Sequence, residues 1–192
     1  APRACWLPEG LERRPFGIAA HLYGLRRDGD QGIGDFTTLA AFGRMAAERG
    51  AATLGLNPLH AQFGHDRERA SPYHPSDRRF LDPVYLDLAS GPFATVPAVR
   101  IALARHETLF AASAARTVVD YPAVWRAKRE VLAAAFSVMQ HATGSAFAAL
   151  QDEFSAFIAA GGDDLANFAA FEAISAHQRG KPWQQWPQAL RD

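Results

Sequence analysis

Two short apolar runs mark the first half of the chain. FGIAAHLYGL (residues 16–25) follows Pro15, and AATLGLNPLH (residues 51–60) closes on Asn57-Pro58. Short runs that are apolar at successive positions are typical of strands buried on both faces. We therefore expect two strands in a sheet that is covered on both sides.

The residues between these runs predict a helix. Asp35 can accept hydrogen bonds from the free N–H groups of a helix that begins near Phe36, and Gly50 can take the left-handed conformation that ends one. A strand, a helix and a second strand within such a short span form a βαβ unit, whose two strands are parallel. The face expected to point inward consists of Phe36, Leu39, Ala40, Gly43, Ala46 and Ala47.

The second half, residues 96–190, is rich in Ala and Phe and predicts three or four helices. Gly161-Gly162 is expected to end one helix, and Asp163 or Asp164 to cap the next. Apolar helix faces almost always serve burial, so these stripes indicate packing and not cofactor contacts. The inward-facing stripes are Val124, Trp125, Lys128, Val131, Leu132, Ala135, Phe136 and Met139; then Phe147, Leu150, Phe154, Phe157 and Ile158; then Leu165, Phe168, Phe171 and Ile174.

Composition narrows the class of protein. Of 192 residues 48% are hydrophobic and the formal net charge is zero, which indicates a globular protein without attraction to nucleic acid or anionic lipid. No apolar run reaches the roughly 20 residues of a membrane span. The single cysteine, Cys5, excludes disulfide scaffolds and cysteine-based zinc sites, and a lone thiol favours the cytoplasm.

The segment from Asn57 to Leu88 shows neither helical nor strand periodicity over most of its length. Long ordered loops in compact domains are usually functional, and in α/β barrels the loops after the strands build the active site. Arg78 and Arg79 can pair with Asp77 and Asp82 and hold the loop in place. Prolines that stiffen the segment are Pro58, Pro72, Pro75 and Pro83.

One aromatic residue of this loop is a candidate ligand contact. Tyr73 lies close to prolines on either side and can present a flat apolar face to the C–H groups of a sugar. Packing against its own loop is the alternative, because most loop aromatics only pack.

Other motifs that could indicate a cofactor, a metal site or a catalytic pair give no clear prediction. GIG at residues 32–34 lacks the third glycine of a dinucleotide-binding loop, because that position is Thr37, so a tight strand-to-helix loop explains it better. His60, His65 and His74 have no spacing that favours a metal site, and surface or pocket positions are expected. Acidic residues could form the carboxylate pair of glycoside chemistry, but the sequence alone pairs no two of them.

Several strings in a fixed order closely resemble the 4-α-glucanotransferases, or amylomaltases. GIGDF, NPLHA and SPYHPSDRRFLDPVYLD resemble the N-terminal part of that family's catalytic barrel. VDYPAVWRAKREVL, FEAISAHQRG and PWQQWPQALRD resemble its helical insertion. The resemblance extends from about Phe16 to the end of the chain.

The resemblance implies an α/β fold that is an incomplete (β/α)8 TIM-type barrel with a mostly helical insertion. Residues 16–95 would form the first βα units, with the substrate-binding loop at 57–88. Residues 96–192 would form the insertion, and residues 1–15 a linker.

The resemblance also implies an activity. Family members cut an α-1,4-glucosidic bond, hold the donor as a covalent glycosyl-enzyme and pass it to the 4-hydroxyl of another maltooligosaccharide, with no metal or organic cofactor. The Ser and Tyr of SPY line the donor-side subsites, and the Tyr stacks on glucose. Those residues are Ser71 and Tyr73 here, and Asn57, His60 and His74 are further candidates.

The family's nucleophilic Asp, acid/base Glu and stabilising Asp lie on later barrel strands. We expect these strands after Asp192, so no residue of this segment is predicted to be catalytic and the segment alone is predicted to be inactive. The chain departs from the family pattern at Gln31, usually Trp, and at Asp82, usually Asn. The first change affects a loop anchor, and the second adds a negative charge near the binding loop.

Two alternatives to a transferase are open at this point. The chain could belong to a hydrolase or isomerase of the α-amylase clan. It could also be a non-catalytic module that binds glucan or serves assembly.

Overall fold

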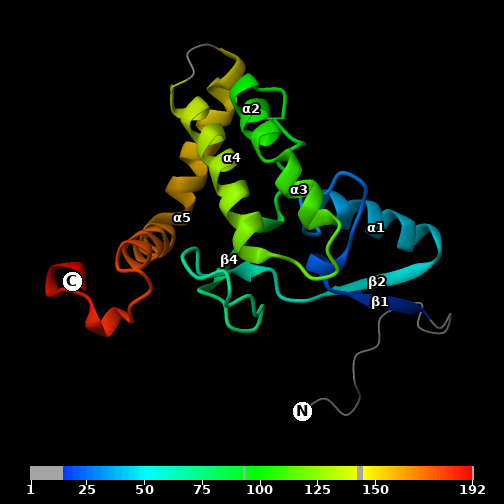
Figure 1. Cartoon of the computed structure of the whole chain (residues 1–192), viewed down its shortest axis with the longest axis horizontal. Helices are drawn as coiled ribbons and strands as arrows, with labels where there is room; N and C mark the ends of the chain where they lie inside the picture. The colour runs from blue at the N-terminus through cyan, green and yellow to red at the C-terminus, as the bar shows by residue number, and fades with distance from the viewer. Residues whose placement is uncertain (1–14, 93, 142–144, 192) are drawn as a thin grey trace.

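The computed structural model describes residues 15–92, 94–141 and 145–191 (Figure 1). Cys5 and nearly all of the predicted linker lie outside these ranges. The strands are β1 (Phe16–Ala20), β2 (Ala51–Leu56), β3 (His60–Ala61) and β4 (Asp77–Leu81). The α-helices are α1 (Phe36–Glu48), α2 (Pro97–Arg105), α3 (Glu107–Ala114), α4 (Tyr121–His141) and α5 (Ser145–His177). Short 3₁₀ helices are η2 (Leu22–Gly24), η3 (Pro83–Tyr85), η4 (Trp183–Gln185) and η5 (Gln188–Leu190).

The predicted βαβ unit is confirmed. β1 and β2 pair in parallel, with Phe16 opposite Ala51 and Ala20 opposite Leu56, and α1 connects them along one side (Figure 1). The apolar run from residue 16 is shorter as a strand than expected, because the chain turns into η2 at Leu22.

The expectation of a sheet covered on both sides is wrong for the described residues. Half-buried and exposed positions alternate along both strands, and Phe16 is 50% exposed. α1 packs against β2 and covers one face, while the described strands leave the residues of the other face exposed. An apolar run permits burial on both faces of a strand, but it does not show which element covers each face.

Helix α1 begins and ends where its sequence predicts. Asp35 Oδ1 accepts hydrogen bonds from the Thr38 backbone N–H and from Thr38 Oγ1, each at 2.7 Å, and Gly50 has a φ of +85°. The predicted inward face is partly wrong, because Ala40 and Ala47 are exposed. Alanine is compatible with either face of a helix, so spacing alone did not separate these positions from the truly inward ones, which include Thr38 and Phe42.

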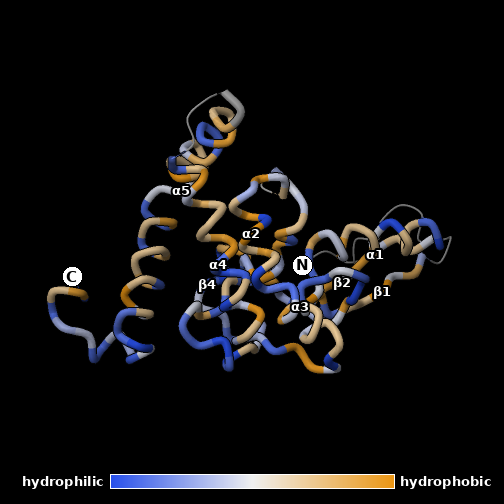
Figure 2. Tube along the Cα trace, turned by 45° about the horizontal axis from the view of Figure 1, so that its top comes forward, coloured by the Kyte–Doolittle hydropathy of each residue, from blue (hydrophilic) through white to orange (hydrophobic). Residues whose placement is uncertain are grey.

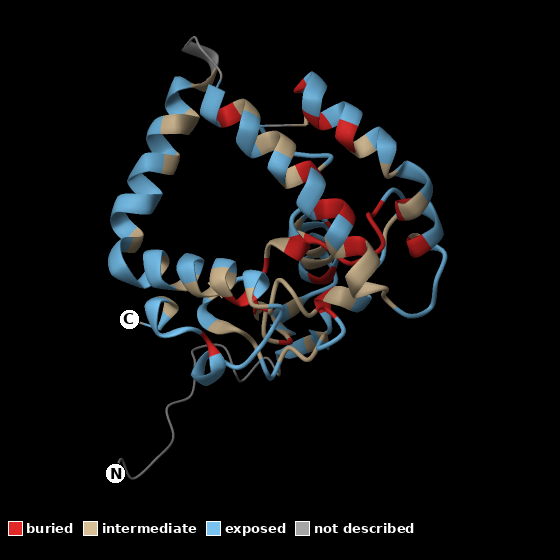
Figure 3. Cartoon of the chain, turned by 60° about the vertical axis from the view of Figure 1, so that its left-hand side comes forward, coloured by how far each residue is buried: buried red, intermediate tan, exposed pale blue. Residues whose placement is uncertain are grey.

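The helical half is organised around α4. Helices α2 and α3 lie along it (Figures 1 and 3). Four of the eight predicted stripe residues are buried, namely Val124, Lys128, Val131 and Met139, and three more are half-buried. Phe136 departs from the prediction, since 43% of it is exposed.

Helix α5 breaks where the paired glycines predict a break. Gly162 has φ 48° and ψ −143°, which is not helical, and the chain turns there into a second helical half (Figure 3). Hydrophobic positions recur along α5 (Figure 2), yet Phe157 and Ile158 are 56% and 49% exposed, contrary to prediction. The first half meets α4 near its start, where the Phe136 and Phe154 rings lie 5.9 Å apart, and then diverges from it (Figure 3).

The main core joins segments that are distant in sequence. Leu22 and Ile33 from the first βα connection, Val84 and Tyr85 from η3, and Val124 from α4 form one buried cluster. Burial of aromatic and branched side chains at this junction stabilises the contact between the strand-containing half and the helical half. Among the described helices, none is long and apolar enough to cross a membrane.

Replacing Asp35 with Ala tests the start of α1. Asp35 is fully buried and also pairs with Arg27 at 3.0 Å, so its loss removes a helix cap and a partner of a half-buried guanidinium. We expect Asp35→Ala to lower the free energy of unfolding by about 2 to 4 kcal/mol. The measurement is urea unfolding followed by circular dichroism.

Asp28→Ala is the matched control, since Asp28 is an exposed carboxylate of the same connection. Its unfolding midpoint should stay within experimental error of wild type. Equal midpoints for the two variants would show that the Asp35 cap contributes nothing.

Candidate functional site

The C-terminal ends of β1 and β2 lie at the same edge of their sheet, because the strands are parallel. Asn57 follows β2 at this edge and its Oδ1 accepts a hydrogen bond of 2.7 Å from the Leu22 backbone N–H, just after β1. Its Nδ2 donates to the Pro58 carbonyl at 2.8 Å. Asn57 therefore ties the two strand exits together at the point where the long loop departs.

The loop from Asn57 to Leu88 is less irregular than its sequence suggests. β3 and β4 pair antiparallel near its ends, with His60 opposite Leu81 and Ala61 opposite Asp77. The excursion over residues 62–76 is thus closed at its base like a wide hairpin.

The centre of the loop is a buried ion pair. Asp82 is fully buried, and its Oδ2 lies 2.6 Å from Arg67 Nη1 and accepts from the Gln62 N–H at 2.9 Å. Its Oδ1 accepts from the Val84 N–H, also at 2.9 Å. The Arg67 guanidinium carbon lies 4.0 Å from the centroid of the Trp125 ring on α4, a cation–π contact.

The ion pairs of the loop correct one expectation about charge and part of another. The negative charge of Asp82 does not face the binding surface, since it is buried against Arg67. Of the ion pairs expected for Arg78 and Arg79, the one between Arg79 and Asp77 is confirmed at 2.7 Å, and the one with Asp82 is wrong. Arg79 also pairs with Asp164 of α5, at 2.5 Å. Side-chain hydrogen bonding by Arg79 holds the pKa of Asp77 below its usual range.

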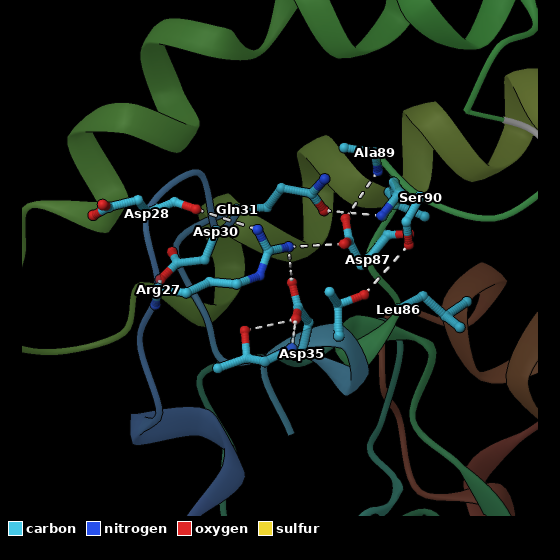
Figure 4. A network of polar contacts seen from close by, with 12 residues as sticks. Arg27, Asp28, Asp30, Gln31, Asp35, Leu86, Asp87, Ala89 and Ser90 are labelled. Carbon is cyan, nitrogen blue, oxygen red and sulfur yellow. Dashed lines mark hydrogen bonds and ion pairs between the residues drawn. The ribbon is translucent and has the colours of Figure 1, made fainter. Parts of the chain in front are cut away.

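A second polar network fixes the end of the loop against the first βα connection (Figure 4). Arg27 Nη2 lies 3.0 Å from Asp35 Oδ2 and 2.7 Å from Asp87 Oδ2, so one guanidinium joins the start of α1 to the loop exit. Gln31, buried next to it, accepts a hydrogen bond of 3.3 Å from the Leu88 N–H. Gln31, where the family resemblance leads us to expect Trp, therefore contacts the end of the loop.

Asp30 stabilises the same connection. Burial alone would raise its pKa, but hydrogen bonds from Arg26 and from the backbone N–H groups of Gly32 and Arg27 outweigh it and hold the pKa below its usual value. Asp30 is therefore ionised in the folded state at neutral pH, as an acceptor of its neighbours' N–H groups.

Lys128 of α4 reaches the loop from the helical half. It is fully buried, and its Nζ donates to the carbonyls of Val84 and Leu86, each at 2.7 Å. Burial lowers the pKa of Lys128 from 10.5 to about 8, although the carboxylates of Asp35, Asp87 and Asp30 oppose this shift. The ammonium thus satisfies the carbonyls at the end of η3, which have no helical partner.

The residues predicted to touch a sugar fall into two groups. Ser71, Tyr73 and His74 share one turn, closed by a hydrogen bond of 3.1 Å from the His74 N–H to the Ser71 carbonyl, and Tyr73 is 60% exposed. Asn57 and His60 lie at the base of the loop instead. Pro72 and Pro75 brace the turn on both sides of the exposed ring.

The sequence did not predict the loop contacts of three residues. Arg67 and Trp125 meet at the centre of the loop, and Glu172 of α5 accepts hydrogen bonds from the Gly64 N–H, at 2.9 Å, and from the Ser76 hydroxyl. Their partners are distant in sequence, so no local pattern could have identified them.

A hollow beside the end of the loop is apolar. It has a volume of about 500 Å³ and is lined mainly by hydrophobic residues, among them Phe36, Leu86, Leu88, Val131, Phe136 and Phe154. Sugars require several convergent hydrogen-bonding groups besides an aromatic face, so the exposed turn is the better candidate. Within the described residues, no group of His, Cys, Asp and Glu side chains could hold a metal ion.

Comparison with known proteins decides the family. A family model described as 4-alpha-glucanotransferase matches residues 20–192. The chain belongs to the 4-alpha-glucanotransferase family. It is 34% identical over 194 aligned residues to a 4-alpha-glucanotransferase of Mycobacterium tuberculosis, covering 96% of this chain and 26% of that protein. A 4-alpha-glucanotransferase of Haemophilus influenzae is 29% identical, with 93% of this chain and 26% of that protein covered.

A solved structure of a family member has the same arrangement of elements. The crystal structure of amylomaltase from Corynebacterium glutamicum matches 94% of this chain with a TM-score of 0.71 and 25% identity. The match covers 26% of that chain. The chain therefore spans about a quarter of the length of the relatives it matches.

The buried lysine gives a pH-dependent prediction. The folded state releases the Lys128 proton near pH 8 and the unfolded chain near 10.5, so the unfolded chain binds more protons between these values. The stability of wild type relative to Lys128→Met should therefore rise by about 1 to 2 kcal/mol between pH 8 and 9.5 and stay constant below that window.

The measurement is urea unfolding of both proteins at pH 7, 8 and 9.5. Lys181→Met controls for the loss of a positive charge, because Lys181 is exposed. A constant difference between wild type and Lys128→Met at all three pH values would contradict the lowered pKa of Lys128.

Proposed function

We propose that this chain forms part of the donor-side sugar site of a 4-α-glucanotransferase that moves α-1,4-glucan segments between maltooligosaccharides. Family membership supports a transferase that acts on α-glucans. It gives no support to the hydrolase, isomerase or non-catalytic module considered as alternatives. In this proposal residues 16–95 contribute the first βα units of a (β/α)8 barrel, and residues 96–192 form a helical insertion.

The observation that carries the proposal is the exposed ring of Tyr73 on a braced turn. The ring is 60% exposed although it is large and aromatic, and prolines flank the turn that presents it. A glucose ring has an apolar C–H face, which stacks on such a surface, while nearby hydroxyl groups fix its orientation. Ser71 and His74 lie in the same turn and can supply those polar contacts.

Asn57 and His60 have a different place in this proposal. Both lie at the base of the loop, and both polar ends of the Asn57 amide are already bonded to the backbone. We infer that Asn57 acts on the sugar site through the position of the loop. His60 is half-buried on β3 and stays a candidate for a polar contact with the sugar.

The proposed reaction is retaining transfer. A carboxylate attacks the anomeric carbon of the donor, a carboxylic acid protonates the leaving oxygen, and the glycosyl group then passes from the covalent ester to the 4-hydroxyl of an acceptor sugar. Such a pair of carboxyl groups lies roughly 5 to 5.5 Å apart in retaining enzymes. No step requires a metal or an organic cofactor.

We assign neither catalytic role to a residue of this chain. The buried carboxylates Asp35, Asp82 and Asp87 are each paired with an arginine, and Asp35 and Asp82 also accept backbone N–H groups. Carboxylates engaged in this way are ill suited to attack an anomeric carbon or to donate a proton. As the family resemblance implies, we propose that the nucleophile and the acid/base come from the part of the enzyme outside this quarter. We also propose that the enzyme is cytoplasmic.

Substitution of Tyr73 in the full-length protein tests the proposal. Tyr73→Ala should lower kcat/KM for maltotriose disproportionation at least tenfold, because about 1.4 kcal/mol or more of stacking energy is lost. Tyr73→Phe keeps the ring face and should stay within about threefold of wild type. Product analysis by chromatography measures transfer and hydrolysis together.

An unchanged kcat/KM in Tyr73→Ala would leave this ring without a role in sugar binding. Glucose as the sole product, without longer chains, would show a hydrolase instead.

A further inference from the structure

We propose that Glu172, on the second half of α5, is a positioning residue that sets the place of the Ser71–His74 turn. This inference rests on the proposed function, because it assigns the helical half a role in presenting Tyr73. Glu172 need not touch the sugar, since it acts on the two flanks of the turn.

The Glu172 carboxylate holds both flanks at once. Its Oε2 accepts a hydrogen bond of 2.9 Å from the Gly64 N–H, before the turn, and its Oε1 accepts one from the Ser76 hydroxyl, after it. Ser76 is also bonded through its N–H to the Ala61 carbonyl at 2.8 Å. One side chain of α5 thus bridges two points of the excursion, with the exposed turn between them.

Gly64 is held from two helices. Trp125 Nε1 of α4 donates to the Gly64 carbonyl at 3.0 Å, while Glu172 accepts from its N–H. A Cβ atom at this position would lie only 3.1 Å from Glu172 Oε2, so the close approach favours glycine. Both backbone polar groups of this loop residue are therefore satisfied by side chains of the helical half.

Further contacts fix the second half of α5 on the loop. The rings of Phe80 and Phe168 stack with centroids 4.6 Å apart, and Ser175 Oγ lies 3.2 Å from His65 Nδ1. Arg79 and Asp164 form an ion pair at the start of this half. Because the chain changes direction at Gly162, this half follows the loop and does not continue along the line of the first half (Figure 3).

The prolines restrict the shape of the turn, but few buried contacts fix its position. Tyr73 and His74 are exposed, and Ser71 and Pro72 are only half-buried. A segment with few buried contacts takes its position from the points where its ends are fixed. Here those points include the two groups that Glu172 bridges, so losing the carboxylate should displace the sugar-stacking ring more than it unfolds the protein.

The test is a double-mutant cycle in the full-length protein with maltotriose as substrate. Glu172→Ala should lower kcat/KM at least fivefold. Glu172→Gln should restore most of the activity, because its amide can accept from Gly64 and donate to the Ser76 hydroxyl. Glu153→Ala, which removes an exposed carboxylate from the first half of the same helix, should match wild type.

The second half of the cycle asks whether Glu172 acts by positioning Tyr73 or only by stabilising the protein. In a Tyr73→Ala background, Glu172→Ala should cause little further loss, because the ring that it positions is already gone. Full additivity of the two losses, or unchanged kcat/KM in Glu172→Ala, would overturn the inference while leaving the role of Tyr73 intact. Unchanged activity in Tyr73→Ala would instead overturn the proposed function.

Ser76→Ala replaces Glu172→Ala in the cycle if the latter does not fold. It removes only the hydroxyl arm of the bridge and should show a smaller loss with the same lack of additivity. Additive losses for Ser76→Ala and Tyr73→Ala would likewise overturn the inference.

Discussion

The pairing of Asp82 with Arg67 is the interaction on which the loop depends. A fully buried carboxylate is costly unless its oxygens find hydrogen-bond donors, and here a guanidinium and two backbone N–H groups supply them. Those donors come from positions 62, 67 and 84, so satisfying one charge brings three parts of an irregular segment to one point. The loop has one shape because few other shapes would pair this charge.

The helices provide what the loop cannot provide for itself. An irregular segment leaves backbone groups without regular partners, and buried groups of this kind must be satisfied. Lys128 bonds two carbonyls after β4, and Trp125 and Glu172 bond the two backbone groups of Gly64. The helical half is therefore part of the scaffold of the turn, and its polar residues matter for the loop as much as its apolar stripes matter for the core.

Part of the candidate site could be recognised in the sequence. An aromatic residue among prolines makes Tyr73 and its turn a candidate, because both residue types restrict what the backbone and the ring can do. The structure confirms no more than the exposure of the ring, and its contact with a sugar stays a prediction. The local pair of Arg79 and Asp77 was predicted correctly, whereas pairing Arg78 or Arg79 with Asp82 was wrong. Arg67 lies 15 residues from its partner and Glu172 lies 108 residues from Gly64, so neither contact leaves a local pattern.

What the sequence alone determined is local. The cap at Asp35, the left-handed Gly50 and the break at Gly162 follow from the chemistry of a few adjacent atoms, and so they were predicted correctly. Only the tertiary structure decided which apolar faces are covered, leaving Phe157 and Ile158 exposed, and which acid each arginine meets. Burial and ion pairing depend on which distant segments come together, and that is a property of the packed chain rather than of any window of residues.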